Sequence, residues 1–248
     1  HKLRDVVKLI FRYARKKKYI AWEIDDVLSS FDIEVYTNPL QYRDSSDLVF
    51  TEEEMKRLNE EWKRKPDICN LTLAIIAGTG LRPGEAVAIR KSVVNGSVIT
   101  VDKCEMKYDK DGKRFYEIQN TTKTPAGYRN VVCLPEYQWA LDKLVNDSED
   151  EWLCVENGKN LTTKKIRDRL YYTCKRLGIP QRSTDKLRKT VATYLAEIGV
   201  DDRDIIAQLG HTDISVTNNH YIKNRKPAQD RLKRFVSLQE KAIKCNQW

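Results

Sequence analysis

Cysteine and histidine occur in this sequence without the spacing that metal sites or disulfide frameworks require. The six cysteines are scattered singly from Cys69 to Cys245, no two of them form a CxxC pair, and histidine occurs only three times. Structural zinc sites need four closely spaced ligands of these types, and disulfide-rich domains are small and secreted. We therefore expect reduced, mostly buried thiols in an intracellular protein that uses no metal.

Long apolar runs are also missing. No stretch reaches the roughly 20 apolar residues that a membrane-spanning helix needs, and none has the pattern of a signal peptide. The sequence therefore predicts a cytoplasmic protein that has no membrane partner. The chain begins at His1 rather than Met, so we expect a further portion of the protein upstream.

The charge is not balanced. Lys and Arg exceed Asp and Glu by 45 to 36, which gives a net charge of +9 at pH 7, while 40% of the residues are hydrophobic. The apolar content predicts a folded chain, and its length suits either one large domain or a domain plus a fragment. The excess of cations favours a polyanionic partner, because each phosphate that Lys or Arg neutralises releases condensed counterions.

Hydrophobic periodicity predicts an α+β protein that is mainly helical. Residues 2–20 form an amphipathic helix with a basic opposite face, and residues 32–48 lack periodicity and read as a linker. Short β-prone runs between residues 92 and 134, separated by the turn signals Asn95-Gly96 and Asp111-Gly112, predict one three-stranded antiparallel sheet. Further helices are expected at about 51–63 (with a capping box of Thr51 and Glu54), 67–78, 83–91, 136–146, 162–177, 184–199, 201–209 and 228–243.

Four segments carry residues suited to a metal-free attack on a phosphodiester. They are GTGLRPGEAVAIR with Arg82, TTKTPAG with Lys123, LRKTVATYL with Arg188, and LGHTDISVTNNHY with His211 and Tyr221. Guanidinium groups bind phosphate oxygens, an imidazole donates a hydrogen bond to them, an ammonium can protonate a leaving oxygen, and a phenol can act as the nucleophile.

Each of these residues also has a plainer interpretation. Arg82 precedes Pro83 at a helix start, which favours anions, but it could simply pair with Glu85 to tie the turn. Lys123 on a hairpin tip could be solvated rather than catalytic. Arg188 in the first turn of its helix is disfavoured by the helix dipole unless it serves an anion or a carboxylate.

The closing segment allows two interpretations. His211 follows Gly210, which can end the preceding helix, and Tyr221 is one of 12 tyrosines, most of which are expected to pack on surfaces. The run DDRDIIAQLGHTDISVTNNHY also fits a helix-turn-helix, which in a basic protein would indicate a transcriptional regulator.

Taken together and in this order, the segments resemble the tyrosine recombinases of the phage integrase family. GTGLRPGE resembles the first arginine box, TTKTPAGYRNVVCLP the lysine-bearing β-hairpin, LRKTVATYL the second arginine box, and LGHTDISVTNNHY the closing box. The resemblance covers residues 50–225 and is greatest to integrases of bacterial prophages and conjugative transposons. It implies the catalytic set Arg82, Lys123, Arg188, His211 and Tyr221, with Glu85 as structural support.

The resemblance also implies a division of the chain into parts. Residues 1–31 would be the end of a core-binding domain, 32–48 a linker, and 49–225 the catalytic domain. Residues 226–248 would form a C-terminal helix that either docks on a neighbouring subunit or folds back on its own domain.

One position departs from the family pattern. The family usually has His three residues before the second arginine, and this chain has Asp185, followed by Lys186. A carboxylate could accept the tyrosine proton, but it would repel phosphate and pair readily with Arg82, Arg188 or Lys186. The sequence therefore predicts either reduced activity or partial substitution by Lys186.

The function implied is site-specific recombination of double-stranded DNA by a tetramer, through a 3′-phosphotyrosyl link and without metal, cofactor or small-molecule substrate. Three alternatives stay open. One is nicking and resealing like that of a type IB topoisomerase, one is a non-catalytic helix-turn-helix protein, and one is a recombinase relative silenced by Asp185.

Overall fold

The computed structural model describes residues 2–21, 49–120 and 128–210. The chain divides into two units, residues 1–43 and 44–248. In the first unit, helix α1 (Lys2–Lys16) is amphipathic, and the side chains of Leu9 and Ile10 are 64% and 59% exposed. The predicted helix ends four residues early because Lys18 adopts a left-handed φ of 58°, and the Lys18 N–H donates to the Arg15 carbonyl instead.

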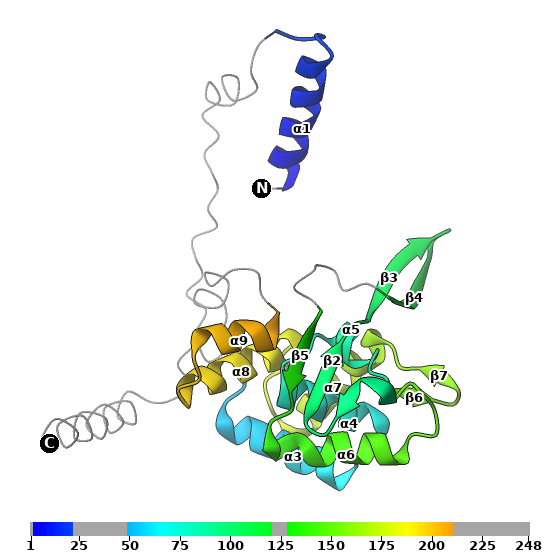
Figure 1. Ribbon diagram of the computed structural model, residues 1–248, viewed down its shortest axis with the longest axis vertical. Coiled ribbons are helices and arrows are strands. Elements are labelled where there is room, and N and C mark those ends of the chain that lie inside the picture. The colour runs from blue at the N-terminus through cyan, green and yellow to red at the C-terminus, as the bar shows by residue number, and fades with distance from the viewer. Residues whose placement is uncertain (1, 22–48, 121–127, 211–248) are drawn as a thin grey trace, which may run out of the picture. The chain divides into compact units, whose positions relative to one another are not determined.

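The second unit is built around one buried helix. Helix α4 (Ile68–Thr79) begins at the N-cap Asp67, and 11 of its 12 residues are buried. Around it pack α3 (Glu52–Arg64), α6 (Gln138–Asp147), α7 (Thr163–Leu177) and α8 (Thr184–Glu197), as Figure 1 shows. A helix without a polar face can be stable only when its whole circumference is covered, so α4 forms the centre of the core.

Most predicted helices are confirmed to within about two residues, the usual spread between ways of assigning helix ends. The capping box at Thr51 is present, since its hydroxyl accepts from the Glu54 N–H and the Glu54 carboxylate accepts from the Thr51 N–H. Helix α9 (Asp202–Leu209) ends at Gly210 with a left-handed φ of 64°, as its sequence predicts. It packs with α8 over a small cluster that includes Val191, Leu195, Ile205 and Leu209.

The predicted helix at 83–91 is wrong in length. Helix α5 spans only Pro83–Ala86, and a 3-10 turn follows at Lys91–Val93. Between them the chain forms a β-bridge from Arg90 to Trp152, in which the Leu153 N–H donates to the Ile89 carbonyl. These long-range hydrogen bonds replace those of a continued helix, so tertiary pairing overrides the local helix propensity.

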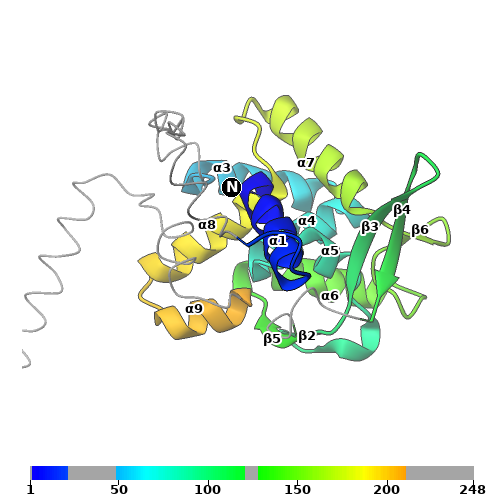
Figure 2. The same ribbon diagram turned by 90° about the horizontal axis from the view of Figure 1, so that it is seen from above.

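The three-stranded antiparallel sheet is present, in the order β1 (Val94–Asn95), β2 (Val98–Val101) and β5 (Arg129–Val132). The run RFYEIQ does not join it. That run forms β4 (Lys113–Gln119), which pairs with β3 (Cys104–Lys110) in a hairpin of its own. Figures 1 and 2 show this hairpin at the edge of the unit, away from α8 and α9.

Turn chemistry explains both hairpins. Asp111 and Gly112 have φ values of 51° and 71°, so the two-residue loop has the primed geometry that matches strand twist and joins β3 directly to β4. Asn157 and Gly158 repeat this pattern, with φ values of 53° and 70°, in the small hairpin β6 (Val155–Glu156) and β7 (Lys159–Asn160). We did not predict that second hairpin, although its Asn-Gly pair is visible in the sequence.

The cysteines of the described residues are free, and all but the half-buried Cys104 are buried. Burial raises the pKa of Cys133 and Cys154 to about 12, and that of Cys174 to about 11. These three thiols are therefore uncharged near neutral pH and act as small apolar side chains. Among the helices that the structure describes, none is both long and apolar enough to cross a membrane.

Candidate active site

Arg82 lies at a turn that a glycine makes possible. Gly80 ends α4 with a left-handed φ of 71°, and a Cβ atom there would lie 2.7 Å from the Cδ2 atom of Leu209. The chain can therefore turn sharply and bring α9 close to the end of α4. Two residues later Arg82 is the N-cap of α5, and 45% of its side chain is exposed.

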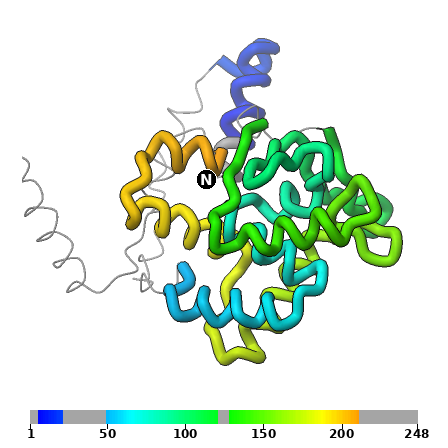
Figure 3. Tube along the Cα trace, turned by 60° about the horizontal axis from the view of Figure 1, so that its bottom comes forward, coloured from blue at the N-terminus to red at the C-terminus, as the bar shows by residue number. Residues whose placement is uncertain are grey.

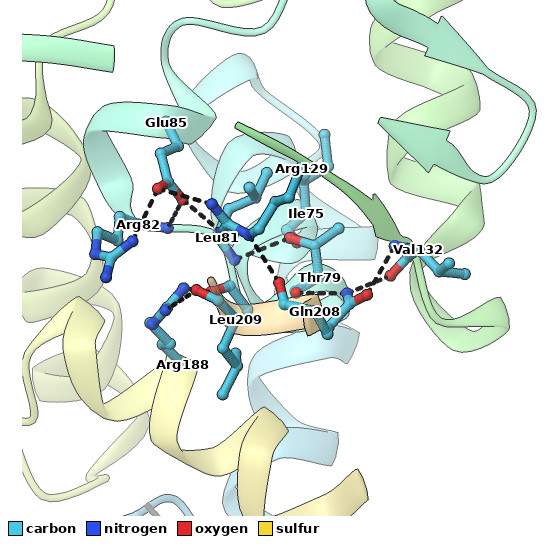
Figure 4. Close-up of polar contacts among 11 residues, drawn as sticks. Ile75, Thr79, Leu81, Arg82, Glu85, Arg129, Val132, Arg188, Gln208 and Leu209 are labelled. Atoms are coloured by element: carbon cyan, nitrogen blue, oxygen red, sulfur yellow. Dashed lines mark hydrogen bonds and ion pairs between the residues drawn. The ribbon is translucent and has the colours of Figure 1, made fainter. Parts of the chain in front are cut away.

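The Glu85 carboxylate binds two arginines. Arg82 donates its backbone N–H to Oε2 at 2.9 Å and its Nη1 to Oε1 at 3.0 Å. Arg129, the first residue of β5, donates Nη1 to Oε1 at 3.1 Å and Nη2 to Oε2 at 2.9 Å. The side chain of Glu85 is only 4% exposed, so these four hydrogen bonds fix the carboxylate between the two guanidinium groups (Figure 4).

The two arginines also determine the charge state of Glu85. Burial raises the pKa of a carboxyl group because it penalises the charged form. The hydrogen bonds and charge of Arg129, together with the backbone N–H and charge of Arg82, outweigh this effect and hold the pKa of Glu85 below its ordinary value. Glu85 is therefore an anion at neutral pH, as structural support for Arg82 requires.

Arg188 is buried and connects two turns. It is 2% exposed, its Nη1 donates to the Gly80 carbonyl at 2.5 Å, and its Nη2 donates to the Leu209 carbonyl. Helix α8 begins at Thr184, so Arg188 is its fifth residue and lies beyond the first turn. The expected place of Arg188 in the first helical turn is therefore wrong, so the dipole argument does not apply to it, and the backbone carbonyls at two helix ends account for its position.

Gln208, in the last turn of α9, connects the same region to the sheet. Its Nε2 donates to the Thr79 carbonyl and to the Val132 carbonyl, both at 2.8 Å, and its Oε1 accepts from the Val132 N–H at 3.0 Å. Its own backbone carbonyl accepts from Arg129 Nε at 3.0 Å. The end of α9 is thereby held against the end of α4 and against β5, and Figure 3 shows α9 (orange) beside β5 (green).

The structure thus brings together three of the residues that the sequence singled out, Arg82, Glu85 and Arg188. Figure 4 shows the side chains of Arg82 and Arg188 at the same end of the network. Lys123, His211 and Tyr221 lie outside the described residues, as does the segment 226–248. Their neighbours in the chain are placed: β5 follows the Lys123 segment, and Gly210 directly precedes His211.

The position that departs from the family pattern is also placed. Asp185 lies exposed in the first turn of α8, where a carboxylate is favoured by the helix dipole. The neighbouring Lys186 is half-buried, and its backbone N–H donates to the Ser183 carbonyl. The contacts of Arg82 with Glu85, and of Arg188 with Gly80 and Leu209, account for both arginines without a pairing to Asp185.

Sequence reasoning missed Arg129 and Gln208. The sequence holds one weak signal for Arg129. It lies two residues before the buried Val131 on β5, and residues two apart on a strand face the same side of the sheet. An arginine at an inward position of a strand implies a buried anion nearby. For Gln208 no local pattern predicts its contacts, since its three side-chain hydrogen bonds go to Val132 and Thr79, which lie 76 and 129 positions away.

The arrangement is suited to binding an anion. An exposed guanidinium, Arg82, is oriented by a buried carboxylate, and a second guanidinium lies next to it in the protein interior. A fixed cation that meets its ligand without reorganising stabilises charge more than a mobile one does. The planar guanidinium presents its N–H donors as a fork, and this fork matches the paired oxygens of a phosphate group.

Comparison with known proteins shows which protein family the chain resembles. The sequence profile of the Phage integrase family matches residues 48–227. A XerC-like tyrosine recombinase of Caldanaerobacter subterraneus subsp. tengcongensis is 26% identical over 246 residues, which cover 88% of this chain and 60% of that protein. The tyrosine recombinase XerA of Thermococcus kodakarensis is 28% identical over 204 residues, 77% of this chain and 64% of that protein. The chain spans about three fifths of the length of these relatives.

Solved structures confirm the fold. The Tn1549 transposon integrase in complex with circular intermediate DNA matches with a TM-score of 0.66 at 16% identity, over 94% of this chain and 77% of that one. The XerA recombinase matches with a TM-score of 0.58 at 24% identity, over 77% and 64%. A λ integrase tetramer bound to a Holliday junction matches with a TM-score of 0.58 at 16% identity, over 90% and 59%. The expected mainly helical α+β catalytic-domain fold is therefore correct.

Proposed function

Because the chain belongs to the phage integrase family of tyrosine recombinases, we propose that it cleaves and rejoins DNA strands at specific sites through a 3′-phosphotyrosyl intermediate. The observation that carries this proposal is the exposed guanidinium of Arg82, fixed by the buried Glu85 beside the buried Arg188. Arrays of fixed cations are what a phosphodiester transition state requires, since negative charge accumulates on its non-bridging oxygens.

In the proposed mechanism, the phenol oxygen of Tyr221 attacks the scissile phosphorus. A bond from phosphorus to the tyrosine oxygen forms as the bond from phosphorus to the 5′-oxygen breaks. Arg82 and Arg188 bind the non-bridging oxygens, with His211 donating to the same oxygens, and Lys123 gives a proton to the departing 5′-oxygen. The reverse attack by a 5′-hydroxyl of a partner strand reseals the DNA. The phosphodiester energy is kept in the tyrosyl link, so the cycle consumes no nucleotide.

The tyrosine proton needs an acceptor, and Asp185 is our candidate for it. Asp185 is exposed in the first turn of α8, three residues before Arg188, so its carboxylate is accessible near that arginine. The rate of adduct formation distinguishes an enzyme that uses Asp185 as the proton acceptor from a relative that Asp185 has silenced. If the wild-type chain forms a tyrosyl adduct that Asp185→Asn slows about tenfold or more, the carboxylate accepts the proton.

Recombination joins two duplexes, so the proposed working form is a tetramer on double-stranded DNA, in a bacterial mobile element that integrates or excises. We propose that residues 226–248 contribute to this assembly. They carry six Lys or Arg residues against two acidic ones. A groove of about 320 Å³ next to α8 is lined by apolar residues such as Met55, Leu134 and Val191, with Glu52, Glu136 and Glu197 also in its wall. An amphipathic basic helix is complementary to that lining.

The decisive experiment uses a nicked suicide substrate that carries a candidate attachment site, followed by a denaturing gel. The wild-type chain should form a covalent protein–DNA adduct, and Tyr221→Phe should abolish the adduct while DNA binding is kept. An adduct that survives Tyr221→Phe would show that another residue is the nucleophile. Absence of any adduct from the wild-type chain would favour the helix-turn-helix or silenced-relative alternatives.

Two further measurements separate the remaining alternatives. A supplied partner strand distinguishes recombination from resealing, because a topoisomerase-like enzyme would relax supercoiled DNA without exchanging strands. Deletion of residues 226–248 should prevent tetramer assembly on DNA but not binding of a single protomer. A tetramer that forms normally after this deletion would show that the segment serves its own domain only.

A further inference from the structure

Arg129 has no role in the mechanism above, yet it binds the same carboxylate that holds Arg82. Its side chain is 7% exposed, whereas that of Arg82 is 45% exposed. Arg129 is therefore much less accessible to DNA than Arg82 is. Its guanidinium is instead directed inward, with two nitrogens on the Glu85 carboxylate and the third on the Gln208 carbonyl (Figure 4).

Because Glu85 binds Arg129 as well as Arg82, it accepts fewer hydrogen bonds from the Arg82 guanidinium. A carboxylate and a guanidinium alone tend to form a two-pronged pair in which both oxygens each accept from a guanidinium nitrogen. Here both oxygens of Glu85 already accept from Arg129, so Arg82 gives only Nη1 of its guanidinium to Oε1. The remaining nitrogens of Arg82 are left directed away from Glu85, on a side chain that is almost half exposed.

The third contact of Arg129 acts on a different segment. Gln208 lies in the last turn of α9, where backbone carbonyls have no partner within the helix. Arg129 Nε donates to the Gln208 carbonyl at 3.0 Å, so one side chain joins the beginning of β5, the start of α5 and the end of α9. Two residues beyond Gln208 the chain reaches Gly210 and leaves α9.

We propose that Arg129 is a positioning residue for phosphodiester cleavage: it occupies Glu85 so that Arg82 keeps guanidinium nitrogens for the scissile phosphate, and it fixes the end of α9. This inference rests on the proposed function for its effect on cleavage. Its effect on Arg82 is a property of the folded chain and does not depend on the reaction.

The first test is a double-mutant cycle of Arg129→Met and Glu85→Gln, scored by single-turnover cleavage of the nicked substrate well below the unfolding temperature of each variant. Arg129→Met should slow cleavage roughly 10- to 100-fold because Glu85 then takes Arg82 into a two-pronged pair. In the Glu85→Gln background the same change should cost less than about threefold, since no carboxylate competes for Arg82. DNA affinity should change by less than about threefold, because Arg129 is buried.

Arg114→Met is the matched control. It removes one guanidinium that is also paired with a carboxylate, Asp109, but that lies exposed in the β3–β4 hairpin. Its cleavage rate should stay within about twofold of the wild type. Additive effects of Arg129→Met and Glu85→Gln would overturn the inference, as would a loss in DNA affinity that accounts for the whole loss in rate.

The second test needs no catalysis. Phenylglyoxal reacts with guanidinium groups that present two free nitrogens, and peptide mass spectrometry identifies the modified arginine. Arg82 should react in the wild-type chain, become at least about fivefold slower in Arg129→Met, and recover in Arg129→Met/Glu85→Gln. Unchanged reactivity of Arg82 in Arg129→Met would refute the positioning role. If the wild-type chain forms no tyrosyl–DNA adduct but Arg82 shows the expected phenylglyoxal reactivity in all three chains, the result would contradict the proposed function alone.

Discussion

Glu85→Gln is the substitution for which the structure gives the clearest expected magnitude. The change keeps the shape of the side chain but removes the charge that Arg82 and Arg129 share. Arg129 is then left as a cation that is 7% exposed and has lost its anion. Removing one partner of a buried ion pair costs about 3–5 kcal/mol in the free energy of unfolding. Because Arg82 is nearly half exposed and its part is screened by solvent, we expect the lower end, about 3 kcal/mol.

This loss should be visible in thermal unfolding. For a domain of this size, each kcal/mol lowers the midpoint temperature by about 2–4 °C, so the Glu85→Gln variant should unfold about 6–12 °C below the wild type at pH 7. Glu117→Gln is the matched control, since Glu117 lies exposed on β4. Its unfolding free energy should stay within about 0.5 kcal/mol of the wild type.

The pH dependence tests the cause of the loss. The pKa of Glu85 is lower in the folded chain than its ordinary value of 4.5. A carboxyl group with a depressed folded pKa stabilises the fold at pH values above its unfolded pKa, and this stabilisation is lost as the pH falls through the folded pKa. The gap between wild type and Glu85→Gln should therefore be constant from pH 7 to about 5 and narrow below about 4.5. A gap under about 1 kcal/mol at pH 7, or one that does not narrow in acid, would refute the charge argument.

Three other substitutions or groups give direct checks. Gln208→Leu removes three side-chain hydrogen bonds at similar volume and should cost about 1–2 kcal/mol of unfolding free energy in urea titrations; no loss would show that these bonds do not stabilise the fold. Gly84→Ala places a Cβ atom 2.9 Å from the Glu105 carbonyl oxygen and should cost about 1–3 kcal/mol in the same titration, whereas a neutral change would mean that α5 can shift. Cys133 and Cys154, whose pKa values are raised to about 12, should react with a disulfide reagent at pH 8 only after unfolding, and fast reaction in the native chain would contradict their burial.

Local signals in the sequence were sufficient for most of the secondary structure. The capping box at Thr51, the glycine at 210 and the Asp111-Gly112 turn each depend on atoms within a few residues, and each is found where the sequence predicts it. The failures concern partners distant in the chain. The sequence predicts that the β4 run joins the three-stranded sheet, but β4 pairs with β3. It also predicts a helix from Pro83 to residue 91, but the end of that segment pairs with residues near Trp152.

The candidate site follows the same division. The motifs located Arg82 and Arg188, and the pairing of Arg82 with Glu85 was visible as a spacing of three residues at a helix start. That Arg188 is buried on two backbone carbonyls was not predictable, because Gly80 and Leu209 are 108 and 21 residues away. Nor could the sequence show that a second arginine, Arg129, takes up both oxygens of Glu85.

The plain and the functional interpretations of Arg82 are therefore compatible. Its pairing with Glu85 satisfies a turn, and the same pairing orients a guanidinium whose other nitrogens remain accessible. What distinguishes Arg82 from Arg129 is how many of its guanidinium nitrogens the protein uses. Arg129 directs its nitrogens at buried acceptors, whereas Arg82 uses one guanidinium nitrogen on Glu85. A site built this way meets the phosphate with its cation already oriented, and the cost of holding that cation was met when the chain folded.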